Sequence, residues 1–255
     1  MDDPTERGAA LEELARLIDE AETVVAFTGA GISTESGIPD FRSPGGLWTR
    51  YKPIDYRDFV SSEEARRETW RRKFAMEKEI GTVEPNAGHR ALTKLHEAGK
   101  LSHIITQNID GLHVASGMPA EAVIELHGNG TYASCLQCAK RYELDWVREI
   151  FADNERLPVC SKCGGMVKTA TISFGQSMPE DEMARAKAAT FGADLFIVLG
   201  SSLVVYPAAG FPIMAKQNGS GLVIINREDT ELDDIADLVI NAEIGATMSR
   251  VVRVN

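Results

Sequence analysis

The chain has 255 residues, 44% of them apolar and 25% charged, which permits one large domain or two modest ones around a real core. Lys and Arg number 27 against 38 Asp and Glu, a formal net charge of -11. This acidity argues against direct nucleic-acid binding, because phosphate backbones demand concentrated basic side chains. It suits cationic partners such as Lys-rich peptide segments, or it serves only solubility.

The N-terminus and the apolar runs predict a cytoplasmic protein without membrane association. The start, Met1 to Pro4, lacks the basic and apolar regions of a secretory signal. The longest strongly apolar run, Leu195–Leu199, is far too short to span a bilayer.

Apolar spacing predicts the elements in chain order. Leu11, Leu14, Ala15 and Ile18 recur at helical spacing and predict an amphipathic helix. Short β-rich runs follow, with helical stretches between some of them: Val24–Phe27, His103–Thr106, Leu195–Leu199, Leu222–Ile225 and a weaker fifth, Asp237–Ile240. Buried strands alternating with helices predict an α/β fold, a Rossmann-like doubly wound parallel sheet. Several runs end in small or polar residues, at the edge where such sheets bind ligands.

A glycine turn follows the first predicted strand, as Thr28-Gly29-Ala30-Gly31-Ile32-Ser33. Gly29 can take a conformation that a Cβ would obstruct, and Gly31 lets backbone N–H groups approach a diphosphate. The G-x-G-x-x-G fingerprint is incomplete because Thr34 occupies the place of the third glycine. Alone, the turn is therefore also compatible with a simple connection.

A basic run, Arg66–Lys73, falls on a predicted helix. We interpret it as a solvated helix face.

Two cysteine pairs predict a zinc site. Cys135-x2-Cys138 and Cys160-x2-Cys163 offer four thiolates, enough for a closed tetrahedral shell, which indicates a structural zinc ion. The 21 residues between the pairs, 139–159, favour an insertion that carries a helix at Glu143–Phe151. We expect a small zinc-binding module at 130–168 inserted into one domain formed by 1–129 and 169–255.

A longer pattern continues the glycine turn. Ser36-Gly37-Ile38-Pro39-Asp40-Phe41-Arg42 follows it, and the two stretches together resemble the signature of the sirtuins, a family of NAD-dependent protein lysine deacylases. Further segments are similar to sirtuin motifs, in the family's order, over about residues 20–245: Gln107-Asn108-Ile109-Asp110-Gly111-Leu112-His113, Leu126-His127-Gly128, the cysteine pairs, Gly200–Ala209 and Asn226.

The resemblance implies a protein lysine deacetylase. Such an enzyme consumes NAD, transfers the acetyl group of an acetyl-lysine protein to ADP-ribose, and releases nicotinamide and O-acetyl-ADP-ribose. By resemblance, His127 is the general base and Asn108 lies at the reaction centre. A histidine suits that role because its proton affinity lies near working pH. Without the motifs, a structural histidine would be the better interpretation of His127, and a turn after a strand would be the better interpretation of Asn108 and Asp110.

The resemblance also implies the contact residues. Glycines, strand-end polar residues and short side chains bind the cofactor: Gly29, Ala30, Gly31, Thr34, Phe41, Arg42, Gln107, Ile109, Asp110, Gly200, Ser201, Ser202 and Asn226. The acyl-lysine enters an apolar tunnel at Ile172, Phe174 and Val205, and Phe174-Gly175 matches a family strand that pairs with the substrate backbone. Ordinary core packing is the alternative for Ile172 and Phe174.

Some positions depart from the family pattern. Thr169 replaces a common proline and Gln176 a glutamate, and both bear on peptide preference. The Tyr and Arg shared by sirtuins that prefer succinyl or malonyl groups correspond to Lys73 and Met76. Without an arginine fork for a distal carboxylate, we expect acetyl or other uncharged acyl groups, although Lys73 could partly substitute.

Three alternative functions remain at this stage. A hydride-transferring dehydrogenase would share the glycine turn, but it expects a complete fingerprint and an acidic residue about twenty positions on, where Asp55 alone is available. A zinc-ribbon nucleic-acid binder conflicts with the net acidity. Mono-ADP-ribosyl transfer could use the same residues as deacetylation.

Overall fold

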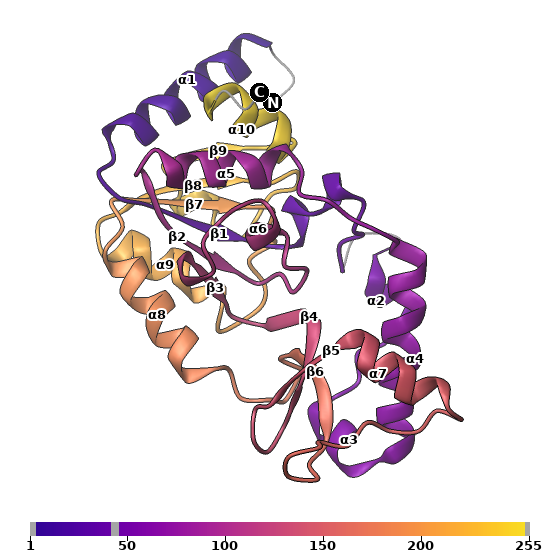
Figure 1. Cartoon of the computed structure of the whole chain (residues 1–255). Coiled ribbons are helices and arrows are strands. Elements are labelled where there is room, and N and C mark those ends of the chain that lie inside the picture. The colour runs from indigo at the N-terminus through magenta and orange to yellow at the C-terminus, as the bar shows by residue number, and fades with distance from the viewer. Residues whose placement is uncertain (1–3, 42–45, 253–255) are drawn as a thin grey trace.

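The computed structural model describes residues 4–41 and 46–252. Its larger part is a six-stranded sheet in which every neighbouring pair of strands is parallel, in the order β3-β2-β1-β7-β8-β9 (Figure 1). The strands are β1 (Val24–Thr28), β2 (Leu101–Thr106), β3 (Val123–Glu125), β7 (Leu195–Leu199), β8 (Gly221–Ile225) and β9 (Leu238–Ile240). The predicted parallel α/β fold and its five strands are confirmed, and β3 is an addition.

Helices cover both faces of this sheet. On one face, α1 (Pro4–Glu20), α5 (Ala87–Glu97) and α10 (Ile244–Val252) contribute to one buried apolar cluster, which includes Leu14, Leu92 and Met248. On the other face, α8 (Glu180–Phe191) and α9 (Gly210–Gln217) pack over a second cluster. The central strands β1 and β7 are apolar, except for Thr28 at the end of β1, because both of their faces are buried.

The register of the sheet brings four strand ends to one level. Thr28 at the end of β1 pairs with Thr106 of β2 and with Leu199 of β7, and Leu199 pairs with Ile225 of β8. The segments that follow these strands therefore leave the sheet side by side, which is where a ligand of a doubly wound sheet binds.

A smaller module is built on an antiparallel sheet of order β5-β4-β6. Its strands are β4 (Gly128–Cys135), β5 (Arg141–Glu143) and β6 (Val167–Thr171), and α7 (Leu144–Ala152) falls where the insertion helix is predicted. The predicted span, 130–168, lies within 128–171. Three strands run through a stretch with little strand signal, because β4 and β6 are rich in small and polar residues.

The module also contains chain from outside its predicted span. Trp70 of α4 (Glu63–Ile80) is fully buried in the apolar cluster of the small sheet, and Phe74 packs on Trp70 and on Phe151 of α7, with ring centroids 5.7 Å and 5.8 Å apart. In Figure 1, α4 and α3 (Tyr56–Ser61) lie beside the small sheet. The two short helices α2 (Leu47–Arg50) and α6 (Leu112–Ala115) complete the α-helices of the described residues.

Within the part of the chain described, the helices are too short or too polar to cross a bilayer.

We predict that Trp70→Ala lowers the free energy of unfolding by about 3–5 kcal/mol, because it empties the centre of the module's core. Urea denaturation measures the change. Trp70→Phe is the matched control: the buried indole N–H has no hydrogen-bond partner among the described residues, and a phenyl ring keeps most of the packing. Equal stability of Trp70→Ala and the wild type would show that α4 does not share this core.

Candidate functional site

Two turns meet where β1 and β7 end. The N–H of Gly31 donates to the carbonyl of Gly200 at 2.8 Å, and a Cβ at Gly31 would lie 2.7 Å from the Cα of Gly200. A Cβ at Gly29 would lie 2.6 Å from the Gly200 oxygen, although Gly29 itself has ordinary extended backbone angles. Glycine is therefore required here because two backbones touch, and Gly200 also has a φ of +66°.

A buried polar cluster lies beside the glycine turn. The side-chain amide of Asn108 donates to the carbonyl of Gly29 at 3.0 Å and to Ser33 Oγ at 3.2 Å. Ser33 Oγ donates to Asp110 Oδ2 at 2.7 Å, and the N–H of Leu112 donates to Asp110 Oδ1 at 2.9 Å. The segment after β2 is thus tied to the glycine turn through side chains, which fixes the positions of Asn108 and Asp110.

His127 lies at the junction of the two sheets. Its Nδ1 is 3.0 Å from the carbonyl oxygen of Gln107, so Nδ1 carries the proton, which leaves Nε2 as the proton-accepting nitrogen. The side chain is half-buried, and the carbonyl of His127 accepts from the N–H of Ile172 at 2.7 Å. Gln107 in turn donates through Nε2 to Ser201 Oγ at 2.8 Å. A histidine oriented in this way can act as a general base.

Behind the site, a chain of hydrogen bonds between buried side chains supports Asn108. Thr28 Oγ1 donates to Thr106 Oγ1 at 2.8 Å and so accepts from His113 Nε2, also at 2.8 Å, while Thr106 Oγ1 accepts the N–H of Asn108 at 3.0 Å. The ring of His89 lies 4.9 Å from that of His113. Burial lowers the pKa of His89 to about 4 and the pKa of His113 well below its usual range, so both rings stay neutral at pH 7.

An aromatic row lies next to the predicted substrate residues. Trp48 packs between Phe41 and Phe174, with ring centroids 5.4 Å apart in each pair. Phe174 is 47% exposed, which excludes the core-packing alternative for it. Ile172 and Val205 are half-buried.

The segment that bears Phe174 is a turn, since β6 ends at Thr171 and Gly175 has a φ of +78°. Gln176, one of the departures from the family pattern, stabilises this turn by accepting the N–H of Ser173 at 3.2 Å. Lys168 donates to the carbonyl of Thr171 at 2.6 Å, and burial lowers the pKa of Lys168 to about 8.

The other predicted cofactor residues surround the same strand ends. Thr34 donates to the carbonyl of Gly31 at 2.9 Å, Ser201 is buried, Ser202 is exposed, and Asn226 donates to the carbonyl of Glu228 at 2.7 Å. Ala30 and Ile109 are half-buried in the two neighbouring turns. Arg42 lies outside the described residues.

Sequence reasoning left Ser33, Trp48, His89 and His113 out of the site. Ser33 and His113 stand inside the quoted motifs, so the motifs themselves could have pointed to them. For Trp48 and His89 no sequence signal was available, because the contacts of Trp48 with Phe174 and of His89 with His113 join segments that are separate in the chain.

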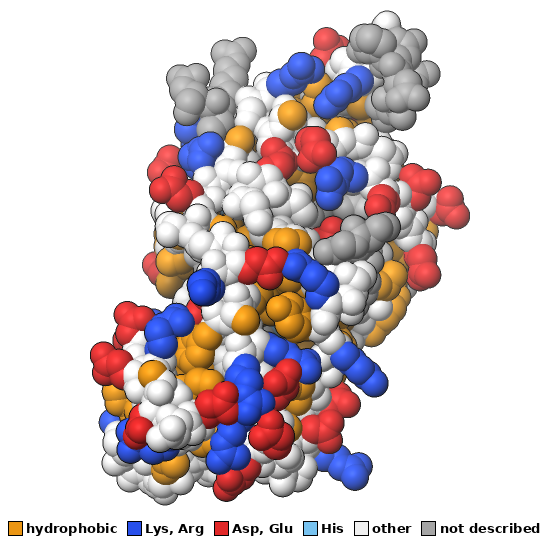
Figure 2. Space-filling model, turned by 90° about the vertical axis from the view of Figure 1, so that its right-hand side faces the viewer, with side chains coloured by type: hydrophobic (Ala, Val, Ile, Leu, Met, Phe, Trp, Pro, Cys, Tyr) orange, Lys and Arg blue, Asp and Glu red, His pale blue; other side chains and the backbone are white. Residues whose placement is uncertain are grey.

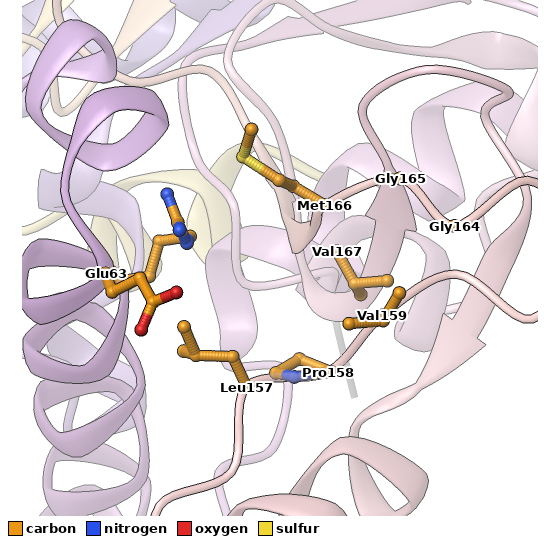
Figure 3. A pocket seen from close by; sticks show the side chains of 9 residues that line it. Glu63, Leu157, Pro158, Val159, Gly164, Gly165, Met166 and Val167 are labelled. Atoms are coloured by element: carbon orange, nitrogen blue, oxygen red, sulfur yellow. The ribbon is translucent and has the colours of Figure 1, made fainter.

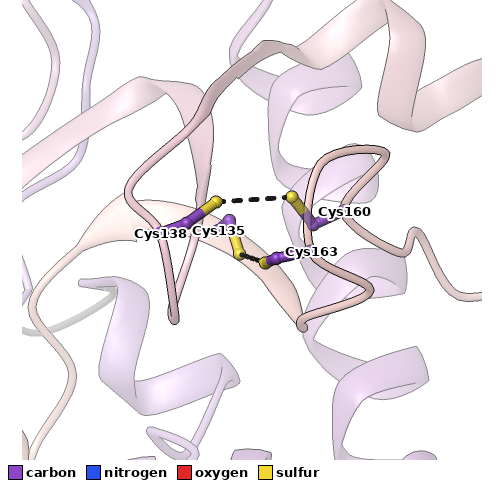
Figure 4. A group of neighbouring side chains, drawn as sticks. All are labelled: Cys135, Cys138, Cys160 and Cys163. Atoms are coloured by element: carbon purple, nitrogen blue, oxygen red, sulfur yellow. Dashed lines mark hydrogen bonds between the residues drawn. The ribbon is translucent and has the colours of Figure 1, made fainter.

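The four cysteines come together in the small module (Figure 4). Their Sγ atoms all lie within 4.8 Å of one another, with Cys135–Cys163 at 3.5 Å and Cys138–Cys160 at 3.6 Å. These distances are too long for a disulfide and close to the edge of about 3.8 Å that follows from Zn–S bonds of about 2.3 Å in a tetrahedron. Backbone N–H groups of Gln137 and Lys162 point to the sulfurs of Cys135 and Cys160, both at 3.4 Å. The donor set therefore fits one structural zinc ion.

The predicted basic run on α4 is largely neutralised. Arg67, Arg71, Arg72 and Lys73 pair with glutamates of the same helix, and Arg71 also pairs with Glu155. On the face shown in Figure 2, acidic and basic side chains alternate over the lower part of the molecule instead of forming one basic patch. The basic side chains are nevertheless half-buried, and Arg71 and Lys73 contact Glu155 and Gly130 outside the helix, so the run is an ion-paired packing surface rather than a solvated helix face.

A cavity of about 140 Å³ opens between α4 and the small module (Figure 3). Its walls are mostly apolar and come from Leu157–Val159, Gly164–Val167, Glu63 and Arg66. The strand ends of the large sheet contribute none of these walls, so this cavity is separate from the polar site described above.

The chain is similar to known proteins over most of its length. The model of the Sir2 family matches residues 29–207. NAD-dependent protein deacetylase 1 of Bradyrhizobium diazoefficiens is 61% identical, covering 94% of each chain, and NAD-dependent protein deacetylase of Rhodopseudomonas palustris is 59% identical, covering 94% of this chain and 95% of its own. A solved Sir2–p53 peptide–NAD+ complex is 38% identical, covers 95% of this chain and 97% of that one, and has a TM-score of 0.82.

We predict that the purified chain contains about one zinc ion and that Cys160→Ser loses it together with solubility, because three thiolates leave the shell open. Metal analysis of the folded protein measures the ratio. Lys162→Ala, which changes an exposed neighbour and leaves every thiol in place, keeps its zinc. A stable, zinc-free Cys160→Ser protein would contradict the structural role.

Proposed function

This chain belongs to the Sir2 family, and from that premise we propose that it is an NAD-dependent protein deacetylase acting on acetyl-lysine. The observation that carries the proposal is the meeting of Asn108, Asp110 and His127 with a glycine turn at aligned strand ends. Bound NAD supplies a ribose carbon that takes up the acetyl oxygen as nicotinamide leaves. One water is consumed, and the products are lysine, nicotinamide and O-acetyl-ADP-ribose.

Each part of this reaction is assigned to residues of this chain. In the turn from Gly29 to Thr34, four N–H groups already donate to backbone carbonyls, so the N–H groups of Ala30 and Thr34 are the ones proposed for the diphosphate. Asn108, fixed by Gly29 and Ser33, and Asp110, fixed by Ser33 and Leu112, orient the ribose and the nicotinamide amide. His127, with Nδ1–H on the Gln107 carbonyl, takes the proton of a ribose hydroxyl through Nε2. Positioning matters most here, because the transition state is a developing cation that needs no strong protein nucleophile.

The acetylated side chain lies against Ile172, Phe174 and Val205. Apolar walls suit an aliphatic stem that ends in a neutral amide, and Trp48 continues this surface from Phe174 to Phe41. Lys73 donates to the carbonyl of Gly130 at 2.7 Å and is paired with Glu77 at 3.0 Å, so its charge is already engaged. The enzyme therefore prefers acetyl or another uncharged group to succinyl or malonyl.

The proposed location follows from the four cysteines, and the proposed partners follow from the net charge. Four cysteines that hold zinc rather than disulfides suit a reducing compartment, and the cytoplasm is the proposed location. Protein substrates with Lys-rich segments match the net charge of -11, and direct nucleic-acid binding does not. Cell fractionation of a tagged chain tests the location.

The decisive experiment is mass spectrometry of the products formed from enzyme, NAD and an acetyl-lysine peptide. Appearance of O-acetyl-ADP-ribose together with nicotinamide supports the proposal. Formation of NADH instead would indicate a dehydrogenase, and ADP-ribose attached to the peptide would indicate mono-ADP-ribosyl transfer. A succinyl-lysine peptide turned over faster than its acetyl counterpart would contradict the acyl preference.

We predict that His127→Ala lowers kcat by about 10²–10⁴-fold, the usual contribution of a general base, while the fold is kept. The same product assay measures the loss, and circular dichroism with zinc content reports the fold. His96→Ala, in a helix away from the strand ends, is the matched control and retains activity. Full activity of His127→Ala would contradict the assigned role.

A further inference from the structure

Three charged side chains join the small module to its helix α4. Glu77 of α4 accepts from Lys73 at 3.0 Å through one carboxylate oxygen and from Arg148 of α7 at 2.7 Å through the other. The guanidinium of Arg148 also lies over the ring of Phe74, 4.4 Å from its centroid. The carboxylate of Glu77 is thus held between two cations from two helices.

Lys73 has a further contact that leads toward the candidate site. Its Nζ donates to the carbonyl of Gly130 in β4 at 2.7 Å, and the N–H of Gly130 donates to the carbonyl of Ile109 at 2.7 Å. A Cβ at Gly130 would lie 3.0 Å from that same Ile109 oxygen, so the two backbones are in close contact. Ile109 directly precedes Asp110.

This link differs from the ion pair between Arg67 and Glu63. That pair stays on α4 itself, the side chain of Glu63 is 66% exposed, and such exposed pairs contribute little to stability. The side chains of Lys73 and Glu77 are only 23% and 28% exposed. Lys73 also holds the carbonyl of Gly130, which is buried and has no side chain of its own to fix its position. A charge-assisted hydrogen bond in such a poorly exposed position contributes more to stability than an ion pair on the surface.

We propose that Lys73 is a positioning residue for the turn at Ile109 and Asp110, and that Glu77, held by Arg148, keeps the Lys73 ammonium on the Gly130 carbonyl. This inference rests on the proposed function, in which that turn contacts the nicotinamide end of NAD. In the proposed function the acyl-lysine contacts Ile172, Phe174 and Val205, and an acetyl group carries no distal carboxylate for Lys73 to bind, so the link acts on NAD rather than on the peptide.

The test is Lys73→Met in the full-length protein. The Kd for NAD, from calorimetry without peptide, and the KM for NAD each rise about tenfold, the equivalent of one charge-assisted hydrogen bond. The KM for the acetyl-lysine peptide and the zinc content stay unchanged. Lys73→Arg, which keeps a donor and a charge, restores most of the affinity. Lys78→Met makes the same change at an exposed position of the same helix and has no effect.

A double-mutant cycle tests the role of Glu77. If Glu77 acts through Lys73, then Glu77→Ala weakens NAD binding in the wild type and adds nothing to Lys73→Met. Any of three results would overturn the inference. The losses of NAD affinity in the double mutant are additive, Lys73→Met keeps the wild-type NAD affinity, or Lys78→Met loses as much NAD affinity as Lys73→Met.

Two further experiments separate a failure of this inference from a folding defect and from a failure of the proposed function. If Lys73→Met does not fold, Gly130→Ala perturbs the same contact at its other end and weakens NAD binding with zinc retained; unchanged affinity there overturns the inference. If the wild-type protein binds NAD but forms no O-acetyl-ADP-ribose, the proposed function fails, while the calorimetric comparison still decides on Lys73.

Discussion

The architecture depends on one contact, the approach of the turn after β1 to the turn after β7. The Gly31–Gly200 hydrogen bond brings the two backbones so close that neither glycine nor Gly29 has space for a side chain. Parallel register makes this approach possible, because Thr28 and Leu199 end their strands at one level. Asn108, in the segment that follows β2, completes the arrangement by donating to the carbonyl of Gly29.

The large sheet was predictable because β1, β7 and β8 are buried on both faces and therefore form nearly continuous apolar runs in the sequence. β3, with Val123–Glu125, is too short to give such a run, and the strands of the small module contain too many small and polar residues. The membership of α4 in that module was hidden, because Trp70 stands among charged side chains that dominate the pattern of the helix.

The site was predictable to the extent that its residues stand in contiguous motifs. The four cysteines meet as their spacing indicates. Contacts between motifs were not readable: Ser33 reaches Asp110 across 77 positions, and only the fold brings them together. The resemblance located Lys73 at one of the two acyl-selecting positions, but its bond to Gly130 depends on how α4 packs against β4.

The seam between the two parts of the molecule has a mechanical consequence. β4 starts directly after His127 and β6 ends directly before Ile172, and Gly128 pairs with Thr171 at this end of the small sheet. A rigid rotation of the zinc-bearing part about this pair would carry the imidazole and the start of the peptide-facing segment in step, while the glycine turns stay with the large sheet. The same movement would act on the turn after β2, because Gly130 of β4 donates to the carbonyl of Ile109 and His127 donates to the carbonyl of Gln107, so nucleotide binding and the position of the imidazole are mechanically coupled.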